Sequence, residues 1–140
     1  TLFPYTTLFR SANTILKEQR SNIDERTAEL CTLRDLAYRA KEAVLAGNID
    51  EIGLLLHENW LLKKRLASGV TDPEIDAMYF AGLSAGAIGG KVAGAGGGGF
   101  LMLYCPKAKQ DAVRDALHGY RELPFSISRD GAKIAFNINT

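Results

Sequence analysis

The sequence predicts an α+β fold, in which helices pack on an antiparallel sheet. Two observations indicate this fold. In the first half of the chain, apolar residues recur at intervals of three and four, as in helices, and after a glycine-rich stretch they alternate, as in strands. The chain has 140 residues, which is enough for one domain with its own core.

Two helices are expected first. One ends at Gly47, and Asn48 followed by Glu51 is a capping-box start for the next. The apolar stripe of the first consists of Leu30, Leu33, Ala37, Ala40 and Val44, and that of the second of Ile52, Leu55, Leu62 and Leu66. The basic run at residues 63–65 that follows is interpreted as a solvated helix end.

A third helix is expected to begin at Thr71 with Glu74, since these residues again have capping-box spacing. Its inward face starts with large side chains and ends with small ones: Ile75, Met78, Tyr79, Gly82, Ala85 and Gly86. Because small residues let another backbone approach closely, we expect the end of this helix to lie against the sheet or the glycine-rich stretch.

Strands are expected after the glycine-rich stretch. Residues 100–105 form a buried strand by composition, and residues 106–119 form a short helix with Ala112, Val113, Ala116 and Leu117 inward. Residues 122–128 and 132–139 alternate as two strands of a hairpin, because Asp130-Gly131 between them is a strong turn signal.

Composition and charge exclude several functional classes. The formal net charge is only +1, so there is no electrostatic case for binding nucleic acid or an acidic membrane surface. Cys31 and Cys105 lie far apart and have no metal-ligand spacing. We therefore expect free thiols, no metal site in this chain, and the reducing environment of the cytoplasm.

The opening residues 1–11, TLFPYTTLFRS, are apolar and aromatic and lack the charged start of a signal peptide. They resemble a translated sequencing adapter. We expect native sequence to begin at residue 12, upstream sequence to be missing, and this segment not to complete an edge of the sheet.

The glycine-rich stretch is the main functional candidate, and two phosphate motifs fail on it. The P-loop pattern would need glycine at Ala85 and a hydroxyl side chain at Val92. The dinucleotide pattern matches at Gly94, Gly96 and Gly99, but it requires a strand before and a helix after, whereas a helix before and a strand after are expected here. Five glycines in the six positions 94–99 cost more conformational entropy than a plain corner needs, which favours a functional loop over a structural one.

The stretch GGKVAGAGGGGFLML at residues 89–103 resembles the third signature motif of the GHMP kinases, a superfamily of small-molecule kinases. The wider run at residues 57–100 is most similar to the branch that acts on D-glycero-D-manno-heptose 7-phosphate. The likeness extends over residues 12–140, which the resemblance identifies as a C-terminal domain whose N-terminal catalytic domain is missing.

The resemblance implies a ferredoxin-like sheet, ATP as phosphoryl donor, Mg²⁺, and a sugar phosphate as acceptor. It implies that the glycine loop helps close the cleft; by position this loop comprises Lys91, Gly94, Ala95, Gly96, Gly97, Gly98 and Gly99. Ala93 stands where many members have a serine or threonine, which removes a hydroxyl contact. The catalytic aspartate, the metal ligands and the principal phosphate loop belong to the other domain, so no catalytic residue is expected here and the chain alone should be inactive.

His57 and Trp60 are the remaining site candidates. They lie within one helical turn, and Asn59 interrupts the apolar stripe between them, so they are either substrate-side residues at the cleft or packed core residues. Lys17 and Arg20 either reach a substrate phosphate or form a solvated helix face.

Three functions stay open. The chain belongs to a sugar-phosphate kinase, or to a fucose-type or mevalonate-type kinase of the same superfamily, or it is a non-catalytic α+β binding module. The sequence does not define the oligomeric state.

Overall fold

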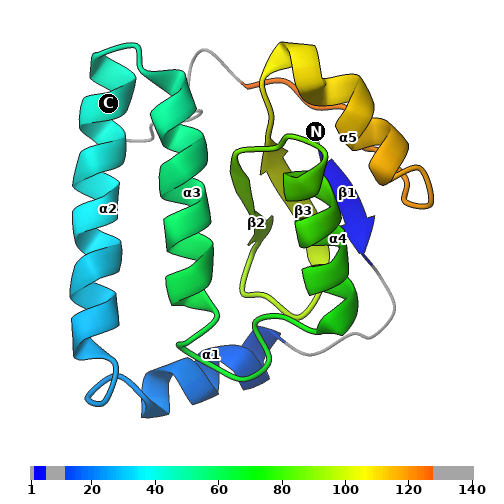
Figure 1. Cartoon of the computed structure of the whole chain (residues 1–140). Coiled ribbons are helices and arrows are strands. Elements are labelled where there is room, and N and C mark those ends of the chain that lie inside the picture. Colours follow the sequence, from blue (N-terminus) through cyan, green and yellow to red (C-terminus); the bar gives the residue numbers. More distant parts are fainter. Residues whose placement is uncertain (1, 6–11, 128–140) are drawn as a thin grey trace, which may run out of the picture.

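The computed structural model describes residues 2–5 and 12–127. In chain order the elements are β1 Leu2–Tyr5, α1 Ala12–Ser21, α2 Thr27–Leu45, α3 Ile49–Lys63, α4 Pro73–Ser84, β2 Gly89–Ala93, β3 Gly99–Tyr104, a 3₁₀ turn η1 Lys107–Lys109, and α5 Gln110–Ala116. The helices α2 and α3 run side by side, α4 lies against the sheet, and α1 crosses below (Figure 1). The predicted α+β fold is therefore confirmed.

The sheet has three antiparallel strands in the order β1-β3-β2. Residues 2–5 pair with β3, so the expectation that the opening segment leaves this edge of the sheet open is wrong for these residues. On the other side of β3, Gly89 to Ala93 pair with Tyr104 to Phe100. The origin of residues 1–11 stays a prediction.

The strand β2 was not expected, because two glycines at its start weaken the strand signal. Gly89 lets β2 approach α3 closely, and Gly90 lets it approach β3 closely. A Cβ on Gly89 would overlap the carbonyl oxygen of Gly53 in α3, and a Cβ on Gly90 would overlap the carbonyl oxygen of Met102 in β3. The glycine-rich stretch therefore begins as the strand β2 and continues as a loop. This loop connects β2 to β3, so a strand precedes it where a helix was predicted.

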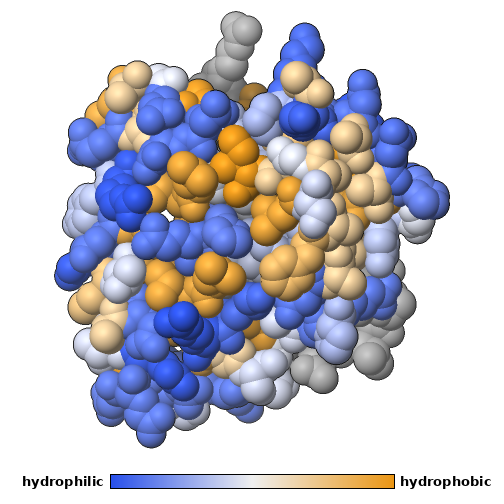
Figure 2. Space-filling view, viewed as in Figure 1, coloured by the Kyte–Doolittle hydropathy of each residue, from blue (hydrophilic) through white to orange (hydrophobic). Residues whose placement is uncertain are grey.

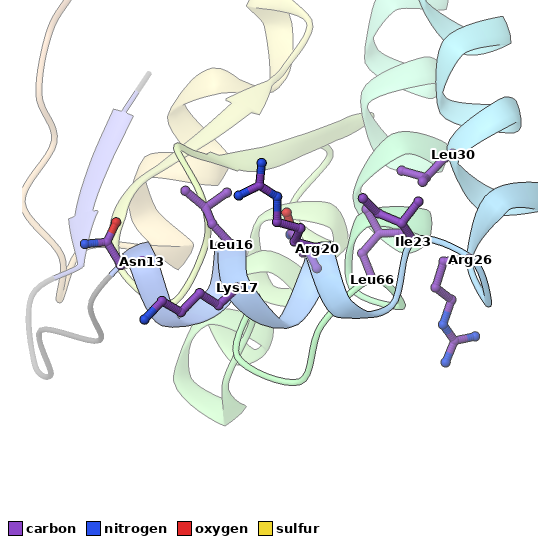
Figure 3. Close-up of a pocket in the computed structure, with 9 residues that line it drawn as sticks. Asn13, Leu16, Lys17, Arg20, Ile23, Arg26, Leu30 and Leu66 are labelled. Atoms are coloured by element: carbon purple, nitrogen blue, oxygen red, sulfur yellow. The ribbon is translucent and has the colours of Figure 1, made fainter.

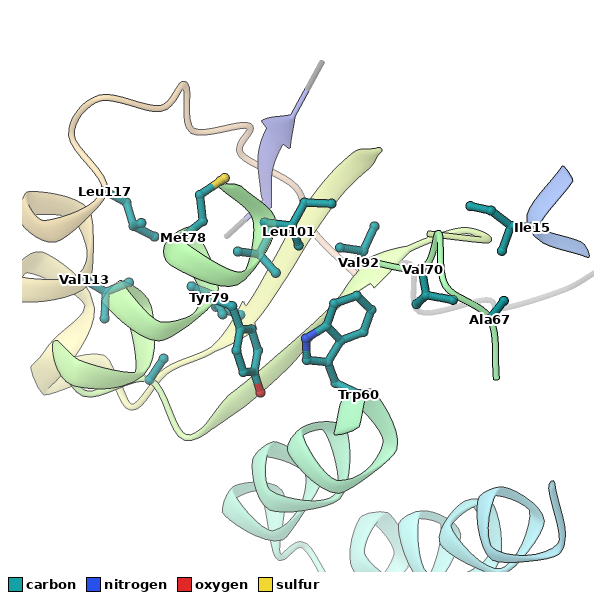
Figure 4. Close-up of a cluster of buried hydrophobic side chains, with 13 residues drawn as sticks. Ile15, Trp60, Ala67, Val70, Met78, Tyr79, Val92, Leu101, Val113 and Leu117 are labelled. Atoms are coloured by element: carbon teal, nitrogen blue, oxygen red, sulfur yellow. The ribbon is translucent and has the colours of Figure 1, made fainter. Parts of the chain in front are cut away.

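The main core lies between the sheet, α3 and α4, and its centre is Trp60 and Tyr79, both fully buried (Figure 4). Ile15 from α1 packs at one end of the same cluster with Ala67 and Val70 (Figure 4). The inward face expected for the third helix is confirmed at Ile75, Met78, Tyr79 and Gly82, and a Cβ on Gly82 would lie 2.6 Å from Leu103 of β3.

A second, smaller cluster joins α2 to α3 through Leu36, Ala43 and Leu55. The predicted stripe on α2 is only partly right: Leu33 and Ala40 pack against this cluster, but Leu30 and Val44 are 37% and 58% exposed. The reason is that Leu36 and Ala43 also have helical spacing with Leu33 and Ala40, and α2 buries only the face that meets α3.

Two helix details also differ from the prediction. The N-cap of α4 is Asp72, whose Oδ1 accepts from the N–H groups of Glu74 and Ile75 at 2.9 Å, while the Thr71 hydroxyl donates to Asp76. In α5 only Val113 is buried, followed by Leu117, and the expected inward residues Ala112 and Ala116 are exposed because the helix is short.

The predicted C-terminal hairpin is not seen in the described residues. Residues 122–127 contain only an isolated bridge at Leu123, so the prediction of a strand is wrong for these residues. Pro124, which has no N–H to donate, interrupts the pairing. The turn at Asp130-Gly131 and the last strand lie outside the described residues.

Candidate functional site

The loop between β2 and β3 has a backbone that only glycine adopts readily. Four of its residues and the first residue of β3 have φ in the left-handed region: Gly94 at 104°, Gly96 at 106°, Gly97 at 69°, Gly98 at 150°, and Gly99 at 111°. Side chains disfavour this region because Cβ approaches the carbonyl oxygen. The glycine run is therefore a consequence of the loop's path.

The middle of the loop is anchored to the segment before α4. The N–H of Gly97 donates to the carbonyl oxygen of Val70 at 3.0 Å, and a Cβ on Gly96 would lie 2.6 Å from that same oxygen. Val70 is itself fully buried. This half of the loop has a structural role, which is to seat the hairpin on the core.

The start of the loop is open. Gly94 is exposed, and a Cβ there would meet nothing within 4 Å. Within residues 12–127, the N–H groups of Gly94, Ala95, Gly96 and Gly98 make no backbone hydrogen bond. Gly94 is exposed and Ala95 is half-buried, and adjacent free N–H groups beside left-handed glycines form a concavity that suits an anion.

One lysine contacts this open part directly, and a second lies on the strand that leads into it. Lys63, the last residue of α3, donates from Nζ to the carbonyl oxygen of Gly94. Burial lowers the pKa of Lys63, and the charge of Lys91 on β2 lowers it further. Free N–H groups and two cations together form a setting that stabilises a negatively charged group.

The structure places His57 and Trp60 in the packing between α3, α4 and β2. The Tyr79 hydroxyl lies 2.6 Å from His57 Nδ1, and the two rings stack at 5.9 Å with an interplanar angle of 2°. Trp60 is fully buried next to Tyr79. These contacts are with protein groups, and a substrate-side role for either residue stays a prediction.

A hollow of 630 Å³ lies where α1 meets the start of α2, with an apolar lining that includes Leu16, Ile23, Leu30 and Leu66 (Figure 3). Lys17, Arg20 and Arg26 surround it, but their side chains point in different directions (Figure 3). Because the three charges do not converge, this hollow has no focused anion site.

Apolar side chains gather over α3 and α4 on the face shown in Figure 2. Leu54 and Leu61 of α3 and Phe80 of α4 are exposed. None of the described helices has the length and apolar character that crossing a membrane requires. No three His, Cys, Asp or Glu side chains among the described residues come together as metal ligands.

Comparison with known families identifies the chain. Residues 40–121, more than half of its length, match the family described as GHMP kinases C terminal, and this range includes both lysines and the whole glycine loop. The chain belongs to the GHMP kinases. The resemblance of the glycine motif to this superfamily is thereby confirmed.

Individual GHMP kinases match over most of the chain. A D-glycero-alpha-D-manno-heptose 7-phosphate kinase of Campylobacter jejuni is 28% identical over 95% of this chain and 40% of its own length. A mevalonate kinase of Thermococcus sibiricus is 31% identical over 93% of this chain and 41% of its own length. The crystal structure of L. major mevalonate kinase in complex with R-mevalonate superimposes with a TM-score of 0.70 at 21% identity, over 84% of this chain and 37% of that one.

The chain thus spans about two fifths of the length of these two relatives. The similarity of fold confirms an α+β GHMP kinase C-terminal domain. Heptose 7-phosphate and mevalonate kinases match at similar identity, so the family is shown and the acceptor is not.

The sequence gives no sign of two residues of this candidate site. Lys63 was interpreted as part of a solvated helix end, and Val70 has no motif of its own. The helical period places Lys63 one turn after Asn59, near the end of the helix. It does not predict that the Lys63 side chain donates a hydrogen bond to a loop 31 residues later in the sequence.

Replacing Gly96 by alanine is expected to displace the loop from Val70. The new Cβ meets the Val70 carbonyl oxygen, and the positive φ costs a further ~1 kcal/mol. Gly94→Ala is the matched control, because its φ is similar but the space is open. Urea unfolding should show a loss of about 2 to 3 kcal/mol for Gly96→Ala and about 1 kcal/mol for Gly94→Ala. Equal losses would mean that the contact with Val70 is unimportant.

The buried tyrosine predicts a loss of stability at high pH. Burial raises the pKa of Tyr79 to about 12, although a backbone hydrogen bond from Gly90 opposes the shift. Between the ordinary pKa of about 10 and this value, the unfolded chain loses the proton while the folded chain keeps it, so folding weakens as pH rises. Tyr79 therefore contributes stability that is complete below pH ~10 and lost by pH ~12.

The variant Tyr79→Phe isolates this effect. At pH 8 it should be about 1 kcal/mol less stable than the wild type, because it leaves His57 without its partner. Above pH ~10 the wild type should lose its advantage in unfolding free energy, and near pH 12 Tyr79→Phe should be the more stable protein. The difference in unfolding free energy between the two proteins should change by about 2 kcal/mol over this range. A difference in unfolding free energy that is constant between pH 8 and pH 12 would contradict the raised pKa.

Proposed function

We propose that the chain is the C-terminal part of an ATP-dependent kinase that phosphorylates D-glycero-D-manno-heptose 7-phosphate at its anomeric hydroxyl. The observation that carries this proposal is the open glycine loop, which combines unpaired N–H groups with Lys63 and Lys91. Phosphoryl transfer depends mainly on positioning and on neutralising the charge of phosphate oxygens, and this arrangement suits both tasks.

In this proposal the loop forms one wall of the transfer cleft. The residues of that wall are Lys91, Gly94, Ala95, Gly96, Gly97, Gly98 and Gly99. ATP is the phosphoryl donor, and Mg²⁺ neutralises its phosphates. Following the resemblance, we place the metal ligands, the catalytic base and the principal phosphate loop outside this chain, which would then be inactive alone.

The choice of a sugar phosphate is supported by the Campylobacter jejuni relative, a heptose 7-phosphate kinase that matches 95% of the chain. Mevalonate kinases and an L-fucokinase/L-fucose-1-P guanylyltransferase match at 28% to 33% identity, which supports mevalonate or fucose as alternative acceptors. We also propose a cytoplasmic location, in which the free thiols Cys31 and Cys105 stay reduced.

A substrate panel tests this proposal. The full-length kinase that carries this chain is assayed with ATP and Mg²⁺ against heptose 7-phosphate, R-mevalonate and L-fucose. We expect kcat/KM for heptose 7-phosphate to exceed the other two by at least about 100-fold. Heptose 7-phosphate left unphosphorylated excludes the heptose branch, and no transfer to any acceptor favours a non-catalytic binding module.

A further inference from the structure

Lys63 and Lys64 are adjacent at the end of α3, but only Lys64 has a negatively charged partner among the described residues. Lys64 Nζ lies 3.1 Å from Asp76 Oδ1 and 5.7 Å from the centre of the Phe80 ring, so its charge is balanced. Lys63 turns to the glycine loop and donates to the Gly94 carbonyl oxygen instead. The sequence presents Lys63 and Lys64 as one basic run, but among the described residues only Lys64 of this pair belongs to a salt bridge.

The neighbour of Lys63 is another cation. Burial is the main reason that the pKa of Lys63 is lowered, the charge of Lys91 lowers it further, and both side chains are partly buried. No carboxylate within residues 12–127 forms a salt bridge with either lysine. Two like charges that act on each other and have no salt-bridge partner among the described residues favour the binding of an anion.

The position of this pair indicates where an anion would bind. Lys63 already contacts the open start of the loop, where the N–H groups of Gly94 and Ala95 have no backbone partner. A carbonyl oxygen is a weaker acceptor for an ammonium group than a doubly charged phosphate. A phosphate at this point would therefore draw Lys63 Nζ away from Gly94.

We propose that Lys63 is a phosphate-binding residue, which together with Lys91 and the open N–H groups of the glycine loop holds a phosphate group of a bound substrate. Lys63 donates to the Gly94 carbonyl oxygen and transfers this hydrogen bond to a phosphate oxygen on binding. The inference rests on the proposed kinase function for the identity of the substrate, since the phosphate comes either from ATP or from the sugar phosphate.

Inorganic phosphate is the first probe. Amide spectra of the ¹⁵N-labelled 140-residue chain are recorded during a titration, and we expect saturable shifts at Gly94, Ala95 and Gly96. Lys63→Gln should weaken binding about tenfold, and Lys63→Arg should restore most of it. Arg65→Gln removes the same charge two residues away, from an exposed side chain, and should change binding less than about twofold.

Two competition arms identify the source of the phosphate. ATP or heptose 7-phosphate is added to the phosphate-loaded chain, and the one that displaces phosphate from the loop amides is the source. The proposal is overturned if phosphate does not bind, if it shifts other amides, or if Lys63→Gln and Arg65→Gln weaken binding equally.

The test of the phosphate site can fail while the proposed kinase function holds, and the reverse is also possible. Loss of phosphate binding in Lys63→Gln with no competition by ATP or heptose 7-phosphate supports the site and excludes both compounds as its ligands in this chain, while the assay of the full-length kinase decides the kinase assignment. Transfer to heptose 7-phosphate by the full-length kinase with unchanged kinetics in its Lys63→Gln variant supports the assignment and overturns the site.

Discussion

Replacing Gly89 by alanine is expected to destabilise the domain by about 3 kcal/mol, because α3 and β2 meet backbone to backbone at this point. The added Cβ overlaps the Gly53 carbonyl oxygen and lies 2.9 Å from His57 Cβ. Neither neighbour is the flexible end of a long side chain, so the strand must move away from the helix. The free energy of unfolding, measured in urea by circular dichroism, gives the size of the loss.

The matched control is Gly119→Ala. A Cβ at Gly119 meets nothing within 4 Å, and its φ lies outside the left-handed region. This variant should be within about 0.5 kcal/mol of the wild type. A similar effect of both substitutions would show that the close approach of α3 to β2 does not limit stability.

Truncating Trp60 to alanine is expected to cost about 4 kcal/mol, the largest effect of a single side chain in the core. Trp60 is fully buried and packs against Tyr79 at 6.2 Å between ring centres. Its removal leaves a cavity where α3, α4 and the sheet meet, which the surrounding backbone fills only partly.

Leu61→Ala is the control for Trp60→Ala, because Leu61 is the next residue of the same helix and is 39% exposed. Its truncation should cost less than about 1 kcal/mol. If Trp60→Ala costs no more than Leu61→Ala, Trp60 does not anchor the core, and a role at the cleft would gain support.

The sequence predicts those elements whose pattern depends on neighbours along the chain. The turn at Gly47, the Asn48 cap and the inward face of α4 are local features, and the structure has them. The strand β2 is different. Its glycines are set by contacts with α3 and β3, which lie far away in sequence, and their composition resembles a loop.

The candidate site shows the same limit. The glycine loop is recognisable because five glycines in six residues need a special reason. Lys63 is not recognisable, because a lysine at the end of a helix is favoured by the helix dipole whatever else it contacts. Its relation to Gly94 depends on how the hairpin is seated on Val70, which is a tertiary contact.

We propose that the glycine loop shapes the site of phosphoryl transfer. The most direct measurement is kcat/KM for heptose 7-phosphate in the full-length kinase and in its Gly96→Ala and Gly119→Ala variants, at a temperature where all three are folded. We predict a loss of at least about tenfold for Gly96→Ala, because a displaced loop misplaces the phosphate, and no loss for Gly119→Ala. Equal activity in all three proteins would contradict the claim and leave the loop as a connection between two strands.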